Sequence, residues 1–106
     1  MALPKKHRLV SRSDFDKVFK EGKAVKGSFL FIKSRVNEFG FPRFGFIVPK
    51  KIYSKAVDRN RLERVLSEIV AQYIKSDAIN SRDFIVVISK QGQENFVRNE
   101  LTNLLR

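Results

Sequence analysis

The stretch 56-AVDRNRLERVLSEIVAQYIK-75 has the most regular pattern in the chain, and the other elements can be placed around it. Its apolar side chains recur at intervals of three and four residues: Leu62, Val65, Leu66, Ile69, Val70, Tyr73 and Ile74. This spacing places them on one wide face of an amphipathic helix. We predict that the helix begins between Ala56 and Arg59, ends near Lys75, and buries this face.

Two short apolar runs, 29-FLFI-32 and 44-FGFIV-48, precede this helix and predict strands. Turn-forming residues lie between them (Asn37, Gly40 and Pro42). Two antiparallel strands joined by a loop are the simplest interpretation. Pro49 should end the second strand because it cannot donate a ladder hydrogen bond, and a further short strand is expected near residues 24–25.

The run 83-DFIVVI-88 follows the long helix and is almost entirely apolar and β-branched. Such a run predicts a strand buried on both faces. Val97, Leu101, Leu104 and Leu105 then repeat at helical spacing, which predicts a C-terminal helix.

The N-terminal part predicts a basic arm followed by a short helix. Residues 1–10 hold Lys5, Lys6, His7 and Arg8, and we expect them to be extended. Ser11 is placed to cap a helix that carries Phe15, Val18 and Phe19 on one face, and Gly22 should end it.

The element order α-β-β-α-β-α predicts one α+β domain over residues 1–106. We expect a two-layer sandwich with a single sheet of about four strands and three helices.

The charge is large and unevenly distributed. The 106 residues include 22 Lys and Arg against 11 Asp and Glu, a net charge of +11. Residues 1–64 hold 17 of the basic and 6 of the acidic residues, whereas residues 65–106 hold 5 of each. A one-sided surplus of this size predicts binding to a polyanion such as a nucleic acid.

Several function classes lack the residues they need. The chain has no Cys, no apolar run long enough to span a membrane, and a single histidine, His7. His7 is expected to be solvated or to contact RNA, and no phosphate-binding loop or zinc spacing occurs. We therefore expect a cytoplasmic protein that binds its partner and carries no catalytic residues of its own.

The basic residues concentrate around the start of the long helix. A lysine-bearing segment leads into a first turn rich in arginine, and its candidate RNA-binding side chains are Lys50, Lys51, Lys55, Arg59, Asn60, Arg61 and Arg64. Guanidinium groups match phosphate oxygens, and the positive end of the helix dipole adds attraction. A solvated charged face is the simpler alternative, but few acids neutralise this one.

Eight of the ten phenylalanines lie within residues 15–46, inside the basic part of the chain. Phenylalanines on a strand usually belong to the core. In a basic protein with one sheet, some can instead line a groove on which unpaired bases stack. Alternation assigns Phe29 and Phe31 to one face and Phe44 and Phe46 to one face, and the sequence leaves open which pair is exposed.

Taken together, these motifs resemble the protein subunit of bacterial ribonuclease P. The segment 55-KAVDRNRLER-64 is similar to the family's signature, 44-FGFIVPKK-51 to its strand end, and 14-DFDKVFKEGK-23 to its first helix. The resemblance implies a fold like domain 2 of ribosomal protein S5, with a left-handed βαβ crossover, which runs against the usual hand.

The resemblance also implies roles. The seven basic-segment candidates, with Arg8, match the surface that docks on the catalytic RNA. Phe15, Phe19 and a sheet aromatic, Phe29 or Phe31, match a cleft for the 5′ leader of precursor tRNA. Catalysis would belong to the RNA with its Mg²⁺, and no protein partner or membrane would be required.

The chain departs from the family pattern at several positions. Glu63, Ser67 and Ala71 stand where the family usually has Lys or Arg, and Pro49 stands where it usually has Ser. The loop before the helix is one residue longer than usual, with Ser54 where a Gly is typical. A ribosomal or other structured-RNA-binding protein of the same fold, without a cleavage role, is the alternative. A DNA-binding helix-turn-helix is disfavoured because strands, not a short helix, precede the arginines.

Overall fold

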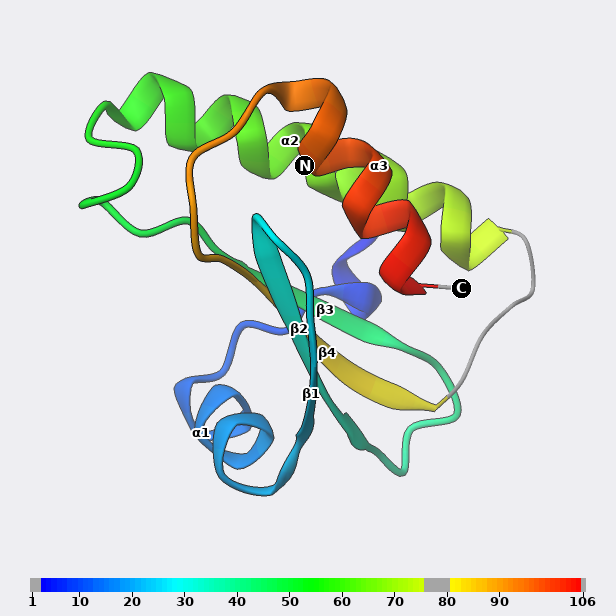
Figure 1. The fold of residues 1–106 in the computed structure, drawn as a ribbon. Helices are drawn as coiled ribbons and strands as arrows, with labels where there is room; N and C mark the ends of the chain where they lie inside the picture. Colours follow the sequence, from blue (N-terminus) through cyan, green and yellow to red (C-terminus); the bar gives the residue numbers. More distant parts are fainter. Residues whose placement is uncertain (1–2, 76–80, 106) are drawn as a thin grey trace.

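Strand β4 (Arg82–Ile88) runs through the interior of a four-stranded sheet with the order β1-β2-β4-β3 (Figure 1). The computed structural model describes residues 3–75 and 81–105. Along the chain, the other elements are η1 (Lys5–His7), α1 (Arg12–Glu21), β1 (Lys23–Lys26), β2 (Leu30–Val36), β3 (Arg43–Ile47), α2 (Ala56–Lys75) and α3 (Glu94–Leu105). The α+β class, the single four-stranded sheet, the three helices and the bounds of the long helix are confirmed.

The prediction that the two early strands pair with each other is wrong. β4 lies between them, antiparallel to β2 and parallel to β3. β4 takes the interior position because it is the most continuously apolar segment, and both of its faces are buried. α2 connects the parallel neighbours β3 and β4, which makes the expected βαβ unit; its left hand stays a prediction.

Helices cover both faces of the sheet. α2 and α3 pack on one face and α1 on the other (Figure 1). Phe84, Val86 and Ile88 of β4 belong to the main core under α2 and α3, whereas Ile85 belongs to a smaller cluster with Leu9 and Val18. None of the described helices is long and apolar enough to cross a membrane.

The N-terminal segment is folded, not an extended arm. Leu3 and Leu9 are buried, and residues 5–7 form a short 3-10 helix. His7 is buried and its Nδ1 lies 2.7 Å from the carbonyl oxygen of Pro42, so the expectation that it is solvated or contacts RNA is wrong. The prediction was wrong because it weighed the basic residues of this segment and overlooked the apolar Leu3 and Leu9. Residues 1–2 lie outside the described residues.

The short helix α1 ends where predicted, although by a different mechanism. Gly22 follows it with an extended backbone, and its N–H donates to the carbonyl of Val18 (2.8 Å). A Cβ at this position would lie 2.8 Å from the carbonyl oxygen of Ser34 on β2. Glycine is therefore needed because α1 and β2 approach closely there.

A buried polar network ties the end of the sheet to α1. Asp83 accepts hydrogen bonds from Arg43 Nε (2.8 Å) and Nη2 (2.7 Å) and from Asn37 Nδ2 (2.8 Å). Arg43 also pairs with Asp14 of α1 (3.3 Å). The hydrogen bond from Arg43 to Asp83 raises the pKa of Arg43, so this guanidinium stays charged. The network joins β3, β4, the 37–42 loop and α1.

Candidate nucleic-acid interface

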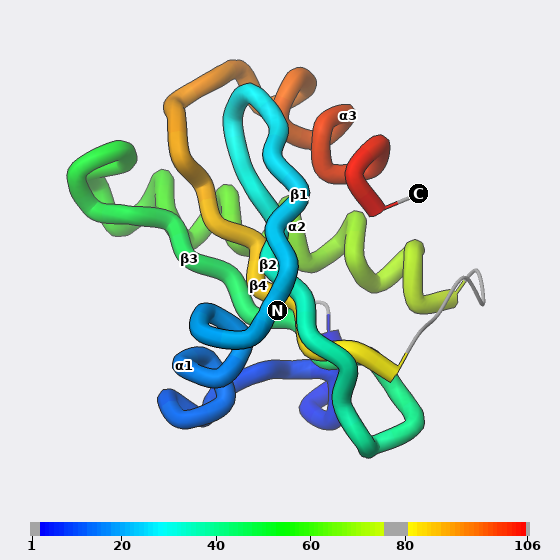
Figure 2. Tube along the Cα trace, turned by 60° about the horizontal axis from the view of Figure 1, so that its bottom comes forward, coloured from blue at the N-terminus to red at the C-terminus, as the bar shows by residue number. Residues whose placement is uncertain are grey.

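The loop between β3 and α2 extends beyond the edge of the sheet (Figure 2), and its lysines are exposed. The N–H groups of Ile52 and Tyr53 both donate to the carbonyl of Pro49 (3.0 Å each), which turns the chain back toward α2. This turn presents Lys50, Lys51 and Lys55 to solvent.

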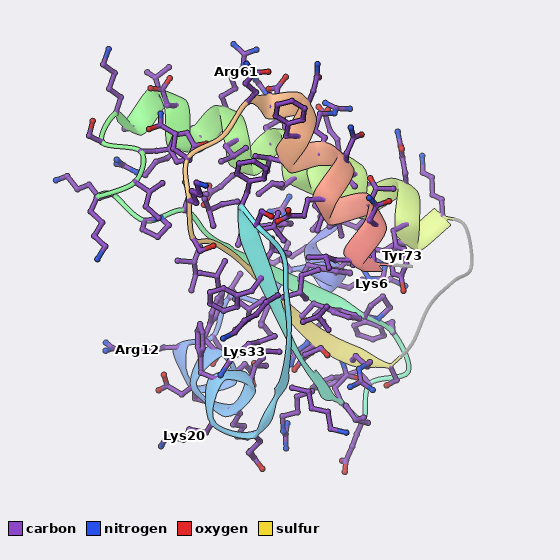
Figure 3. All side chains as sticks on the ribbon, viewed as in Figure 1. Lys6, Arg12, Lys20, Lys33, Arg61 and Tyr73 are labelled. Carbon is purple, nitrogen blue, oxygen red and sulfur yellow. The ribbon has the colours of Figure 1, made fainter. Side chains whose placement is uncertain are left out.

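The first two turns of α2 extend this basic surface. Asn60, Arg61 and Arg64 are all exposed, and Arg61 reaches outward from α2 (Figure 3). Arg61 makes one exposed ion pair, from Nε to Glu94 Oε1 of α3 (3.4 Å). We call Lys50, Lys51, Lys55, Asn60, Arg61 and Arg64 the docking surface.

Arg59 differs from these residues because it is bound within the protein. Its Nη1 donates to the carbonyl oxygens of Tyr53 and Ser54 (2.9 Å each). A guanidinium holding two successive carbonyls fixes the end of the lysine loop. Arg59 therefore shapes the docking surface from within.

The departures at Ser67 and Ala71 fit the packing around α2. Ser67 is fully buried and its hydroxyl donates to the carbonyl of Arg64 (2.8 Å). Ala71 lines a hollow with Pro4 and His7, so the N-terminal segment runs along this side of α2. Burial raises the pKa of Glu63, and the charge of Arg59 partly opposes that shift. A long basic side chain at position 71 would meet the folded N-terminal segment, and one at position 67 would be buried.

Arg8 is not brought together with the docking surface. It bridges to Phe44 near the start of β3, whereas the lysine loop follows the end of that strand. Its Nε donates to the carbonyl of Leu3 (3.0 Å), so it helps to hold the N-terminal segment.

The face of the sheet beneath α1 carries a second candidate surface. Phe15 lies over Gly45, where an added Cβ would overlap the phenyl ring. Phe15, Phe19, Ile47 and Val87 are all partly buried around the same small cluster. Phe31 pairs with Val87 and therefore faces the same side. We call Phe15, Phe19 and Phe31 the aromatic face.

Lys33 adds a positive charge to the aromatic face, which the sequence reasoning missed. It lies two residues after Phe31 on β2 and so shares its side. Its Nζ donates to the carbonyl of Phe19 (2.9 Å) and stands 5.4 Å from the centre of that ring (Figure 3). Alternation along β2 was the signal that could have found it.

Phe29 does not belong to the aromatic face, so its assignment with Phe31 to one side is wrong. It precedes β2, where the backbone N–H groups of Ser28, Phe29 and Leu30 donate to Glu100 of α3 (2.7–2.9 Å). Its ring packs toward the main core and stacks near Phe96. Strand alternation failed because residue 29 lies outside the strand.

Among the described residues, no three His, Cys, Asp or Glu side chains gather closely enough to hold a metal ion.

Comparisons with known proteins agree with this arrangement. The family model described as Ribonuclease P matches residues 3–106. The ribonuclease P protein component of Nitrosococcus oceani is 34% identical over 98 residues, covering 92% of this chain and 80% of that protein. The corresponding protein of Microcystis aeruginosa is 36% identical over 112 residues, covering 99% and 92%.

A solved structure shows the same fold. The ribonuclease P protein of Thermotoga maritima, in complex with 1-(4-fluorophenyl)-2-thiourea, superimposes with a TM-score of 0.82 and 31% identity, covering 92% of this chain and 96% of that one. Family model, relatives and structure point to one conclusion, and the chain belongs to the ribonuclease P protein family.

Proposed function

We propose that this protein is the RNA-binding subunit of ribonuclease P, which joins a catalytic RNA to cut the 5′ leader from precursor tRNA. The docking surface binds the catalytic RNA, and the aromatic face holds the single-stranded leader. The RNA and its Mg²⁺ carry out the hydrolysis, in the cytoplasm and without another protein.

The observation that carries this proposal is the docking surface. Five exposed cations, Lys50, Lys51, Lys55, Arg61 and Arg64, gather on one loop and the adjoining helix turns. The only ion pair recorded for them in the described part of the chain joins Arg61 to Glu94, and both of those side chains are exposed. Exposed cations that lack strong internal partners remain available to phosphates.

The aromatic face suits a single strand. Base–aromatic stacking is tolerant of sequence because every base has a flat face. Phe19 and Phe31 offer rings, and Lys33 holds a positive charge beside them. Arg12 and Lys20 extend from α1 away from the sheet and add positive charge along the same helix (Figure 3).

The chemistry is assigned to the RNA because the one histidine is used in folding. His7 is buried against the carbonyl of Pro42 and cannot reach a substrate. Hydrolysis of a phosphodiester by bound metal ions needs ligands that hold those ions where they stabilise the attacking and leaving oxygens. We propose that the RNA supplies them and that the protein improves substrate binding.

Replacing Phe31 with alanine should lower the preference of the assembled ribonucleoprotein for leader-bearing over mature tRNA. Loss of one base–aromatic stack is worth about 1–3 kcal/mol, which corresponds to about a 5-fold to 150-fold change in the affinity ratio. The measurement is the binding of both tRNAs to complexes of the catalytic RNA with each variant.

Phe31→Tyr keeps the ring and should retain most of the preference. Equal losses of affinity for both tRNAs, or no loss for either, would remove Phe31 from the leader site.

A further inference from the structure

A groove lies between the tip of the β1–β2 hairpin and α3, away from both surfaces described above. Its volume is about 600 Å³, and its lining includes Ser28, Phe29, Phe96, Asn99, Glu100 and Asn103. Glu100 holds the two walls together through its bonds to the backbone of residues 28–30. The tip lies beside α3 in both views of the fold (Figure 1 and Figure 2).

Two aromatic rings form the apolar part of this groove. Phe29 and Phe96 are nearly parallel, at 6° between planes, and their centroids are 6.4 Å apart. Phe96 is 54% exposed, so much of its side chain is open to solvent. Phe96 therefore offers an exposed ring beside the partly buried ring of Phe29.

Polar groups flank the rings. Asn99 and Asn103 follow Phe96 on α3 at spacings of three and seven residues, so all three share one side of the helix. Both amides line the groove, and no hydrogen bond is recorded for either within the described chain. An amide offers a donor and an acceptor together, as the edge of a nucleobase does.

A positive charge stands beside the rings. Lys90 Nζ lies 5.8 Å from the centre of the Phe29 ring, and Lys90 is exposed. Glu100 is the acid in the groove, and its two oxygens are occupied by three backbone N–H groups. Lys90 is therefore the cation beside the rings that can meet a phosphate.

We infer that this groove binds one unpaired nucleotide of the catalytic RNA. The base stacks on Phe96 and Phe29, the amides of Asn99 and Asn103 bind its edge, and Lys90 faces the phosphate. An apolar protein partner would instead leave both amides without hydrogen bonds, which is costly.

The position of the groove selects the catalytic RNA over the leader, and this step rests on the proposed function. Glu94 lies two residues before Phe96 in the first turn of α3, and it pairs with Arg61 of the docking surface. The groove and the docking surface thus both adjoin α3 and lie on the same side of the sheet, where α2 and α3 pack. The aromatic face lies on the opposite side of the sheet.

A single tryptophan tests this inference directly because the chain contains none. Phe96→Trp places a fluorophore on the proposed stack. Catalytic RNA alone should quench its emission in a saturable way, and precursor tRNA alone at the same concentrations should not. Unchanged emission in a complex whose formation is shown by sedimentation would overturn the inference, as would equal saturable quenching by precursor tRNA alone.

The affinity for catalytic RNA gives the second measurement. Phe96→Ala should weaken binding by about 5-fold to 150-fold. Phe39→Ala is the matched control, because Phe39 is 55% exposed and also lies beside a cation, but beyond the opposite end of β2 from the groove. Its affinity should equal that of the natural protein.

Equal losses of RNA affinity in the two variants, or no loss in either, would overturn the inference that the groove binds the RNA. Thermal unfolding checks that the Phe96→Ala variant still folds. If this variant does not fold, the fluorescence of the Phe96→Trp variant tests the inference instead. If the natural protein binds the RNA while the emission of the Phe96→Trp variant stays unchanged, only the groove is excluded. Natural protein that fails to bind would overturn the proposed function as well.

Discussion

Replacing Asp83 with alanine is expected to lower the free energy of unfolding by about 3–5 kcal/mol, the usual cost of breaking a buried ion pair. The side chain of Asp83 is 4% exposed and accepts three hydrogen bonds of 2.7–2.8 Å, two from Arg43 and one from Asn37. Without the carboxylate, a largely buried guanidinium loses its main partner. Urea denaturation of the two proteins measures the difference.

Glu21→Ala is the matched control because it removes an exposed ion pair. Glu21 and Arg35 lie 3.4 Å apart with side chains 58% and 34% exposed. Pairs of this kind contribute about 1 kcal/mol or less. If Asp83→Ala lowers the free energy of unfolding by no more than Glu21→Ala does, the network does not hold α1 to the sheet as described.

Replacing Arg61 and Arg64 together with alanine should weaken binding to the catalytic RNA by about 100-fold, since a charge-assisted hydrogen bond contributes about 1.5 kcal/mol and each such loss is about tenfold. The slope of log affinity against log salt should flatten by about 1.5, because each phosphate contact contributes about 0.7–0.9. Both side chains are exposed, so the thermal midpoint should hardly change. Filter binding across a salt series gives both quantities.

Glu94→Gln provides a control of opposite sign. It removes the carboxylate that pairs with Arg61, so affinity should rise a few-fold and unfolding should be unaffected. An unchanged salt slope in the double arginine variant would show that α2 does not contact phosphates.

The elements with a single dominant period could be predicted from the sequence. α2 covers Ala56–Lys75 as its apolar spacing indicated, and β4 is buried on both faces as its composition indicated. Local spacing carries this information because burial of one face, or of both, is imposed on every residue of the element.

Contacts between distant segments could not be predicted in this way. The order of the strands depends on which strand is buried most completely, and no local pattern states that β4 separates β2 from β3. Phe29 turned toward α3 because Glu100, 71 residues away, binds its backbone. His7 is buried because Pro42 offers a carbonyl acceptor, which a basic sequence context does not reveal.

The candidate site was predicted in part. The lysines and arginines of the docking surface lie close together, but the guanidinium of Arg59 is bound to the carbonyls of Tyr53 and Ser54, and Arg8 lies elsewhere. Sequence shows which residues carry charge. Only the structure shows which of those charges are already satisfied by carbonyl oxygens and which remain exposed to a partner.

The most direct measurement is cleavage of precursor tRNA at low Mg²⁺, with a bacterial ribonuclease P RNA alone, with this protein alone, and with both. We expect cleavage at the end of the leader only when both are present. Cleavage by the protein alone would contradict this account, because it would place the hydrolysis in the protein instead of the RNA. Tight RNA binding that never restores cleavage would make this protein a structured-RNA-binding protein without a cleavage role.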